Sequence, residues 1–262
     1  MTIQISIDQL SKTFPGRNDT AAFTALSNIS CDINSNEFVC LLGPSGCGKS
    51  TLLGLIAGHD QPSKGQIVVD NHTVTGPGAD RGMVFQQYAL FPWYTVEQNV
   101  LLGLKIKGLS PEERTGRAER MLRSVNLWEH RSKFPRELSG GMKQRAAIAR
   151  TLAIEPDVLL MDEPFGALDE QTRERLQDEL LTIWQESRRT VVFVTHSIQE
   201  AVMLSDRILL MGRQQGRIIA DVHNTLPRPR DRMSTDFVAV EREVHGYLKQ
   251  AEFTANEEAA NA

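Results

Sequence analysis

Short apolar runs separated by turn-forming residues recur along the first ninety positions and predict strands. Residues 3–9 and 28–34 alternate apolar and polar side chains, as half-buried strands do. Residues 38–42 form a wholly apolar run, which indicates a buried strand. Further strands are expected at 65–70 and 82–85, and a helix at 51–57.

From about residue 87 to 155 the pattern becomes helical. The run Ser110-Pro111-Glu112-Glu113 supplies a cap residue, a first-turn proline and early acids, which favour a helix start. Apolar strands return at 157–161 and 191–195, with a helix expected at 170–187 between them. The buried face of that helix would carry Leu176, Leu180, Ile183 and Trp184. This strand–helix–strand order predicts an α/β fold with a parallel sheet.

Composition sets the class of protein but not its chemistry. The chain has 262 residues, 40% of them hydrophobic and 24% charged, which fits one large globular domain with room for an inserted subdomain. Its net charge of −4 argues against general attraction to nucleic acid. Cys31, Cys40 and Cys47 lack metal-ligand spacing and are expected to be reduced thiols of a cytoplasmic protein.

The N-terminal residues and the lengths of the apolar runs indicate whether the chain carries a signal peptide or a membrane span. The N-terminal residues alternate like a strand and do not resemble a signal peptide. No run approaches the ~18 uninterrupted apolar residues of a membrane span. Any membrane process would therefore need another chain to cross the bilayer. The small, acidic residues after about 250 are expected to be disordered.

A glycine-rich stretch between the expected strand 38–42 and helix 51–57 matches the phosphate-loop pattern GxxxxGK[ST]. Its glycines let backbone N–H groups surround phosphates, and the next helix adds its positive N-terminal end. We expect Lys49 to reach the β- and γ-phosphates, Ser50 to bind Mg²⁺ and Thr51 to add a donor near the α-phosphate. The expected ATP-binding residues of this loop are Gly43, Pro44, Ser45, Gly46, Cys47, Gly48, Lys49, Ser50 and Thr51.

Two acids, Asp162 and Glu163, follow the apolar run 158–161. Ligands of open α/β sheets bind at the carboxyl ends of such strands. We expect Asp162 to hold Mg²⁺ through a water molecule. Glu163 is the candidate general base that polarises the attacking water.

The run Leu138-Ser139-Gly140-Gly141-Met142-Lys143-Gln144-Arg145 lies between the phosphate loop and these acids. With the three motifs in this order, the chain resembles the ATP-binding-cassette (ABC) ATPases over roughly residues 3–250. The resemblance implies a P-loop NTPase fold with a RecA-like, mostly parallel core, an N-terminal antiparallel β part and an inserted α-helical subdomain. The implied parts are a nucleotide-binding core at 1–86 plus 156–250, a helical signature subdomain at 87–155 and a disordered tail at 251–262.

The resemblance also implies two further catalytic residues. Gln86 matches the Q-loop glutamine that touches Mg²⁺ and water, and we choose it over Gln87 because the family glutamine directly follows the strand aromatic. His196 matches the switch histidine, which contacts the γ-phosphate and orients the water. Together with Glu163, these residues would form the hydrolytic site.

Aromatic residues are candidates for two kinds of contact. Phe14 occupies the family's A-loop position, where a ring stacks on adenine; Phe23 is the alternative, and either could instead be core. In the Q-loop, Phe91, Trp93 and Tyr94 are candidates for docking a cytoplasmic helix of a permease, or for packing within the helical subdomain.

The signature run implies a dimer. In the family, a second ATPase subunit supplies Ser139, Gly140 and Gly141 to the γ-phosphate of its partner's ATP. Asp169 resembles the D-loop that crosses this interface. Two ATP molecules would thus join two subunits head to tail, either two identical chains or this chain and a paralogue. ATP binding would close the dimer and hydrolysis would release it.

Other segments look like the ATPases of nitrate, taurine and alkanesulfonate importers: 75–82, 91–93, 162–169 and 226–230. Asn36, Ser197 and His59 depart from common family residues without removing a catalytic group, and they weaken any claim about the exact substrate.

The resemblance therefore implies the ATPase of a bacterial importer for a small anion. Such a subunit works peripherally at the cytoplasmic face of the inner membrane with two permease chains and, indirectly, a periplasmic solute-binding protein. Alternatives are an importer of another small solute, such as bicarbonate or a pyrimidine precursor, a non-transport ABC ATPase acting on nucleic acid, and a module that holds ATP without turnover. Nucleic acid is not an expected partner, because no basic surface or long coiled-coil insertion is evident.

Overall fold

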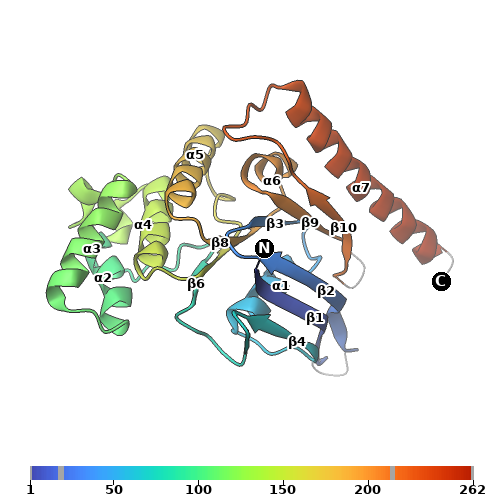
Figure 1. Ribbon diagram of the computed structural model, residues 1–262, viewed down its shortest axis with the longest axis horizontal. Coiled ribbons are helices and arrows are strands. Elements are labelled where there is room, and N and C mark those ends of the chain that lie inside the picture. Colours follow the sequence, from blue (N-terminus) through green and yellow to red (C-terminus); the bar gives the residue numbers. More distant parts are fainter. Residues whose placement is uncertain (1, 17–20, 213–215, 261–262) are drawn as a thin grey trace. The chain divides into compact units, whose positions relative to one another are not determined.

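The computed structural model describes residues 2–16, 21–212 and 216–260, which fall into two compact units (Figure 1). The first, here called the phosphate-loop unit, comprises Met1–Pro77 and Thr190–Ala262. The second, called the helical unit, comprises Gly78–Arg189. This division groups residues 78–86 and 156–189 with the helices, whereas the sequence placed them with the core. The functional domain boundaries stay a prediction.

The phosphate-loop unit contains a four-stranded antiparallel sheet, as expected for the N-terminal part. Its order is β2 (Phe23–Asn34), β1 (Ile3–Phe14), β4 (Lys64–Val69) and β5 (His72–Thr73). Strands β1 and β2 are longer than predicted, since their pairing continues to Phe14 and Phe23 through several register shifts. Such bulges interrupt the apolar–polar alternation on which the prediction depended.

The same unit contains parallel strands that carry the glycine-rich loop. Strand β3 (Phe38–Leu42) pairs in parallel with β8 (Thr190–Thr195) and with β9 (Arg207–Met211), and β10 (Ile218–His223) is antiparallel to β9. Every residue of β3 and β8 is buried, which explains their continuous apolar sequences. Helix α1 (Lys49–Ala57) follows the loop, and α6 (Ile198–Leu204) follows β8.

Helix α7 (Thr235–Ala260) is the last element of the chain (Figure 1). It includes residues 251–260 of the segment for which we expected disorder, and residues 261–262 lie outside the described residues. Disorder of this segment stays a prediction. The alanine and glutamate residues of that segment are strong helix formers, and the preceding turns spare them the cost of nucleation. In the part of the chain that the structure describes, no helix has both the length and the apolar character needed to cross a bilayer.

The helical unit holds two parallel strands, β6 (Arg81–Val84) and β7 (Val158–Asp162), and four helices. The helices are α2 (Val96–Ile106), α3 (Pro111–Ser124), α4 (Gly140–Ala153) and α5 (Glu170–Glu186), with short 3-10 turns at Trp128–His130 and Pro135–Glu137. Helix α3 begins as the sequence predicted: Ser110 accepts a hydrogen bond from the Glu113 N–H, and Glu113 reciprocates.

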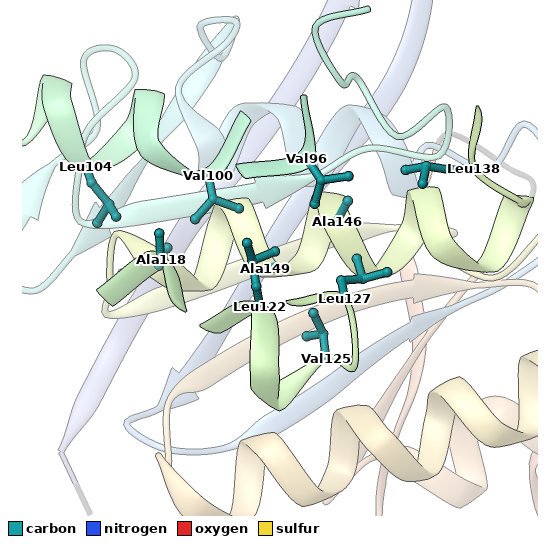
Figure 2. Packing of buried hydrophobic residues seen from close by; sticks show 11 residues of the cluster. Val96, Val100, Leu104, Ala118, Leu122, Val125, Leu127, Leu138, Ala146 and Ala149 are labelled. Carbon is teal, nitrogen blue, oxygen red and sulfur yellow. The ribbon is translucent and has the colours of Figure 1, made fainter. Parts of the chain in front are cut away.

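Helices α2, α3 and α4 pack around one buried apolar cluster (Figure 2). Alanines of α3 and α4 let the helix backbones approach closely, while leucines and valines fill the space between them. The cluster consists of Val96, Val100, Leu104, Ala118, Leu122, Val125, Leu127, Leu138, Ala146, Ala149 and Ala153. Since Leu138 belongs to it, this packing fixes the start of α4, where the signature run lies.

Candidate nucleotide-binding and catalytic site

The glycine-rich loop runs from the end of β3 to the start of α1 in the phosphate-loop unit. Gly46 and Gly48 have φ values of 81° and 97°, a left-handed conformation that glycine adopts without strain. A Cβ atom at Gly48 would lie 2.6 Å from Leu26 Cδ2 and 2.8 Å from the Ala25 carbonyl oxygen. Gly48 is the N-cap of α1 and has no side chain to cap the first turn. The N–H groups of that turn are therefore suited to bind an anion.

Lys49 lies inside this loop and is 4% exposed. Its ammonium donates to the carbonyl oxygens of Gly43 at 2.7 Å and Pro44 at 3.0 Å. Ser45, Gly46 and Ser50 are exposed on the loop surface. Backbone amides, an ammonium and a hydroxyl form a donor set that fits a nucleotide polyphosphate with Mg²⁺.

His196 emerges beside this loop. In the parallel pairing of β3 with β8, Leu42 is opposite Thr195, so Gly43 and His196 leave neighbouring strands at the same edge. His196 is exposed, whereas Thr195 is buried. The Thr195 hydroxyl donates to the Glu200 carboxylate at 2.5 Å and accepts from the Ser197 N–H at 3.0 Å. Both neighbours of His196 are therefore held in place.

Two of the family departures have a conformational explanation. Asn36, where a glycine is common, has a φ of 64°, in the left-handed region that asparagine tolerates better than most residues. Ser197, where aspartate is common, caps α6 by accepting a hydrogen bond from the Glu200 N–H at 3.3 Å. Neither change disturbs the local fold.

Phe14 and Phe23, the two candidates for adenine stacking, lie opposite each other in the pairing of β1 with β2. They are 37% and 61% exposed, so neither is a core residue. The Lys12 ammonium lies 4.9 Å from the centre of the Phe14 ring and 2.7 Å from the Asp60 carboxylate. Its hydrogen bond with Asp60 lowers the pKa of that carboxyl group. Both rings are therefore accessible to a ligand and stay candidates for stacking on a base.

In the helical unit, the structure brings Gln86 and Glu163 together. Val84 is opposite Met161 in the parallel pairing of β6 with β7, so Gln86 and the Asp162–Glu163 pair leave the two strands at the same edge. A Cβ atom at Gly166 would lie 3.8 Å from Glu163 Oε2 and 3.9 Å from Gln86 Nε2. The ends of both side chains therefore lie close to Gly166.

The backbone at Glu163 is strained. Its φ is 41°, in the left-handed region, and its carbonyl oxygen accepts a hydrogen bond from the Gly166 N–H at 3.1 Å. A non-glycine residue held in this conformation costs on the order of 1–3 kcal/mol, and such residues concentrate at functional sites. Glu163, which the sequence predicted as the general base, is one of ten described non-glycine residues with a left-handed φ.

The signature run forms the start of α4. Ser139 is the N-cap, and its hydroxyl accepts from the Met142 N–H at 3.3 Å. Gly141 must be small, because a Cβ atom there would lie 2.9 Å from Thr172 Cγ2. Asp169 caps α5 by accepting from the Thr172 N–H at 3.0 Å, and this hydrogen bond lowers the pKa of Asp169. Gly141 and Asp169, expected at one interface, thus both lie at Thr172, while Ser139 and Gly140 are exposed.

The three candidate docking aromatics form one cluster. The ring centre of Phe91 lies 5.7 Å from that of Trp93 and 5.9 Å from that of Tyr94. Trp93 is 66% exposed, so the cluster is not simply part of the helical core. Tyr94 also lines a groove of about 320 Å³ along α2 and α3. The other lining residues are Gln98, Leu101, Leu102, Lys105, Pro111, Arg114 and Thr115.

Sequence reasoning missed Asn99, which organises the aromatic cluster. This residue is fully buried in α2. Its side chain accepts from the Phe91 N–H at 2.9 Å and donates to the carbonyl oxygens of Phe91, Tyr94 and Thr95. A polar residue on the apolar face of a helix was the signal that could have identified it.

Arg150 was also missed. From α4, its guanidinium donates to the carbonyl oxygens of Ala89 at 2.6 Å and Tyr88 at 3.3 Å. Tyr88 and Ala89 have φ values of 59° and 49°, so this arginine holds a strained stretch of the Q-loop. Burial lowers the pKa of Arg150. No local sequence signal links residue 150 to residues 88 and 89.

The cysteines are free, in agreement with the expectation of reduced thiols. Cys40 and Cys47 are buried and Cys31 is partly buried. Burial raises the pKa of the Cys31 thiol to about 12 and that of Cys40 further above its usual range. Neither thiol is a reactive nucleophile at neutral pH.

Comparisons with known proteins agree on one family. The sequence profile described as ABC transporter matches residues 26–166. The nitrate import ATP-binding protein NrtD of Synechocystis sp. is 51% identical over 225 residues, 86% of this chain and 84% of the relative. The taurine import ATP-binding protein TauB of Rhizobium johnstonii is 50% identical over 216 residues, 82% of each chain. A dimeric ATP-binding cassette solved in a post-hydrolysis state with ADP and Pi is 34% identical, with a TM-score of 0.75, and covers 85% of this chain and 100% of that one.

Proposed function

Since the chain belongs to the ABC transporter ATPase family, we propose that it hydrolyses ATP to drive import of a small anion such as nitrate, taurine or an aliphatic sulfonate. The observation that carries the proposal is the complete set of hydrolytic groups in suitable local settings. Lys49 lies within a preformed loop beside His196, and Glu163 occupies a strained turn beside Gln86. A module that only holds ATP would need Lys49 but not His196, Glu163 or Gln86.

In the proposed reaction, the phosphate loop binds the nucleotide. The amides of Gly46 and Gly48 and the ammonium of Lys49 hold the β- and γ-phosphates, and one of the exposed rings, Phe14 or Phe23, stacks on adenine. Ser50, Gln86 and Asp162 would hold Mg²⁺, whose charge offsets that of the phosphates.

Hydrolysis then depends on groups that act on water. Glu163 accepts the proton of the attacking water, and Gln86 and His196 orient that water against the γ-phosphate. Two observations support this role: Glu163 directly follows β7, and its carboxylate lies near Gly166 together with the Gln86 amide.

We further propose that a second ATPase subunit completes the site. The solved dimeric cassette supports a dimer for this family, and the exposed Ser139 and Gly140 at the start of α4 support a contact made outside this chain. Their hydroxyl and amide groups would bind the γ-phosphate of the nucleotide held by the partner.

Ser139→Arg is expected to leave ATP binding to the single subunit unchanged and to abolish ATP-dependent dimerisation, because the bulky cation would occupy the contact. Light scattering with ATP measures the dimer, in a Glu163→Gln background that slows hydrolysis. Ser110→Arg is the matched control: Ser110 caps α3 as Ser139 caps α4, so it loses about 1 kcal/mol of capping but should dimerise. A large loss of ATP affinity in the Ser139 variant alone would contradict the proposed contact.

The proposed membrane partners are two permease chains, which would place the protein peripherally at the cytoplasmic face of the inner membrane. The exposed Trp93 and the adjoining groove with Tyr94 support docking of a permease helix there. A periplasmic solute-binding protein would deliver the anion to the permease. The solute would contact the permease and the binding protein but not this chain, so the residues of this chain would not select it.

The assignment to small anions is tested by uptake. A strain deleted for this chain is expected to lose uptake of one labelled anion among nitrate, taurine and an alkanesulfonate, and to regain it with the wild-type gene but not with Glu163→Gln. Loss of one uptake names the solute. Normal uptake of all three would overturn the assignment to these anions and turn the search to bicarbonate or pyrimidine precursors, while leaving the ATPase itself untouched.

A further inference from the structure

The segment Leu226-Pro227-Arg228-Pro229-Arg230 stood out in the sequence but has no part in the proposed hydrolytic site. Its last residue, Arg230, is only 8% exposed, which is unusual for an arginine. Burial lowers the pKa of Arg230 to about 10, so the guanidinium is still charged at neutral pH. A buried charge of this kind persists only where it is well hydrogen-bonded.

Arg230 donates from Nε to the Leu226 carbonyl oxygen at 3.2 Å, and its other partners lie at the C-terminal end of helix α6. Its Nη1 group donates to the carbonyl oxygens of Val202 at 2.6 Å, Met203 at 3.1 Å and Ser205 at 2.7 Å. Arg228 donates to the remaining carbonyl, that of Leu204, at 2.6 Å. The last carbonyls of a helix have no partner within it, and cations stabilise that end. The two arginines therefore act as a clamp on the end of α6.

Helix α6 needs such support, because it has only seven residues and isolated helices of that length are unstable. The N-terminal end of α6 directly follows His196 and its cap residue, Ser197. Glu200 of α6 accepts a hydrogen bond from Thr195, and Ser197 begins the helix as its cap, so the residues on both sides of His196 are tied to α6.

The clamp is also fixed to the strand that leads into the phosphate loop. Arg228 forms an ion pair with Asp206. The Asp206 carboxylate accepts a hydrogen bond from the Phe38 N–H at 3.0 Å, and the Asp206 N–H donates to the Phe38 carbonyl oxygen at 2.8 Å. Phe38 is the first residue of β3, whose other end is Leu42 beside Gly43. The clamp is thus attached to β3, the strand that leads into the phosphate loop.

We propose that the Leu226–Arg230 segment, through Arg230, positions His196 for hydrolysis by holding α6 at a fixed place relative to β3. Arg230 is a positioning residue in this scheme and does not touch the nucleotide. The inference rests on the proposed role of His196. When the clamp is loosened, the imidazole loses its fixed position while the phosphate loop keeps its own.

Arg230→Gln is expected to lower kcat for ATP by roughly 10–100-fold, since a displacement of about 1 Å at a reacting group can cost that much. The KM for ATP should stay within about twofold, because the phosphate loop is unchanged. Arg230→Lys should recover most of the rate, since an ammonium can still donate to the clustered carbonyls. If Arg230→Gln does not fold, Arg230→Lys and Arg228→Gln carry the test, with smaller losses of kcat expected at unchanged KM.

Arg207→Gln is the matched control. Arg207 has a side chain that is 11% exposed and lies on β9 of the same unit. Its guanidinium contacts Asp221, Glu37 and the Asp32 carbonyl oxygen, none of which belongs to α6. This variant should lose a comparable amount of thermal stability but keep kcat within about twofold. If it loses as much kcat as Arg230→Gln, the effect reflects general destabilisation and the proposal is wrong.

A double-mutant cycle with His196→Ala separates this inference from the proposed function. If Arg230 acts through His196, then Arg230→Gln should add no further loss of kcat in single-turnover reactions of the His196→Ala enzyme. Multiplied losses would overturn the positioning role. Full turnover by His196→Ala itself would instead show that the role proposed for His196 has failed, and the inference would fail with it.

Discussion

Glu163→Gln is expected to lower the rate of ATP hydrolysis by about 10²–10⁴-fold while ATP still binds, the range that loss of a general base produces. The amide has nearly the shape of the carboxylate but cannot accept the proton of the attacking water. The substitution also keeps a non-glycine residue at the φ of 41°, so it changes the chemistry at an unchanged backbone strain. Phosphate release under single-turnover conditions, together with ATP affinity, measures the two quantities separately.

Glu155→Gln is the control for this experiment. Glu155 lies in the same unit, has a φ of 49°, and makes an ion pair with Arg117 at 2.8 Å outside the site. The same chemical change at a similarly strained glutamate should leave turnover unaltered, because pairs of this kind contribute about 0–1 kcal/mol to stability. Equal turnover of Glu163→Gln and the wild type would exclude Glu163 as the base.

Lys49→Ala is expected to weaken ATP binding by roughly 30- to 4,000-fold. Removing one member of a buried, charged pair costs about 2–5 kcal/mol, and each 1.4 kcal/mol is a factor of ten. The loop would also lose the bonds from the ammonium to Gly43 and Pro44, which hold it in shape before ATP arrives. Titration calorimetry with ATP measures the affinity directly.

Lys107→Ala is the control, which tests whether removing a lysine elsewhere in the chain also weakens ATP binding. Lys107 likewise donates to a backbone carbonyl oxygen, that of Ile154 at 2.5 Å, but in the helical unit and at an exposed position. Its removal should leave ATP affinity within about twofold, as for most surface substitutions. An unchanged affinity in Lys49→Ala would refute the assignment of the phosphate loop.

The parts of the fold and site that the sequence predicted well are those that depend on local residues. Strand β3 matches its expected bounds, since its apolar run ends abruptly at the glycine-rich loop. The sequence of that loop favours its conformation directly, because Gly46 and Gly48 occupy the positions where the backbone is left-handed. Helix α5 begins at Glu170, as expected, since Asp169 caps it.

The parts that were missed depend on contacts between distant residues. Strand β1 extends to Phe14 only because bulged pairing with β2 continues there. The left-handed turn at Glu163 follows an ordinary strand, and glutamate has no intrinsic preference for it. Arg230 lies some 25 residues or more from each carbonyl that it binds in α6. A single sequence shows that this arginine exists, but not that it is buried.

The bonds made by Arg150 have a consequence for how such a protein can change over evolutionary time. Arg150 lies on α4, whose N-cap is Ser139, so its hydrogen bonds tie the Tyr88–Ala89 loop to that helix. The acceptors are main-chain oxygens, which no point mutation in the loop removes. The exposed indole of Trp93 is not one of these acceptors, so exchanging it for another side chain would leave the bonds between the loop and α4 in place.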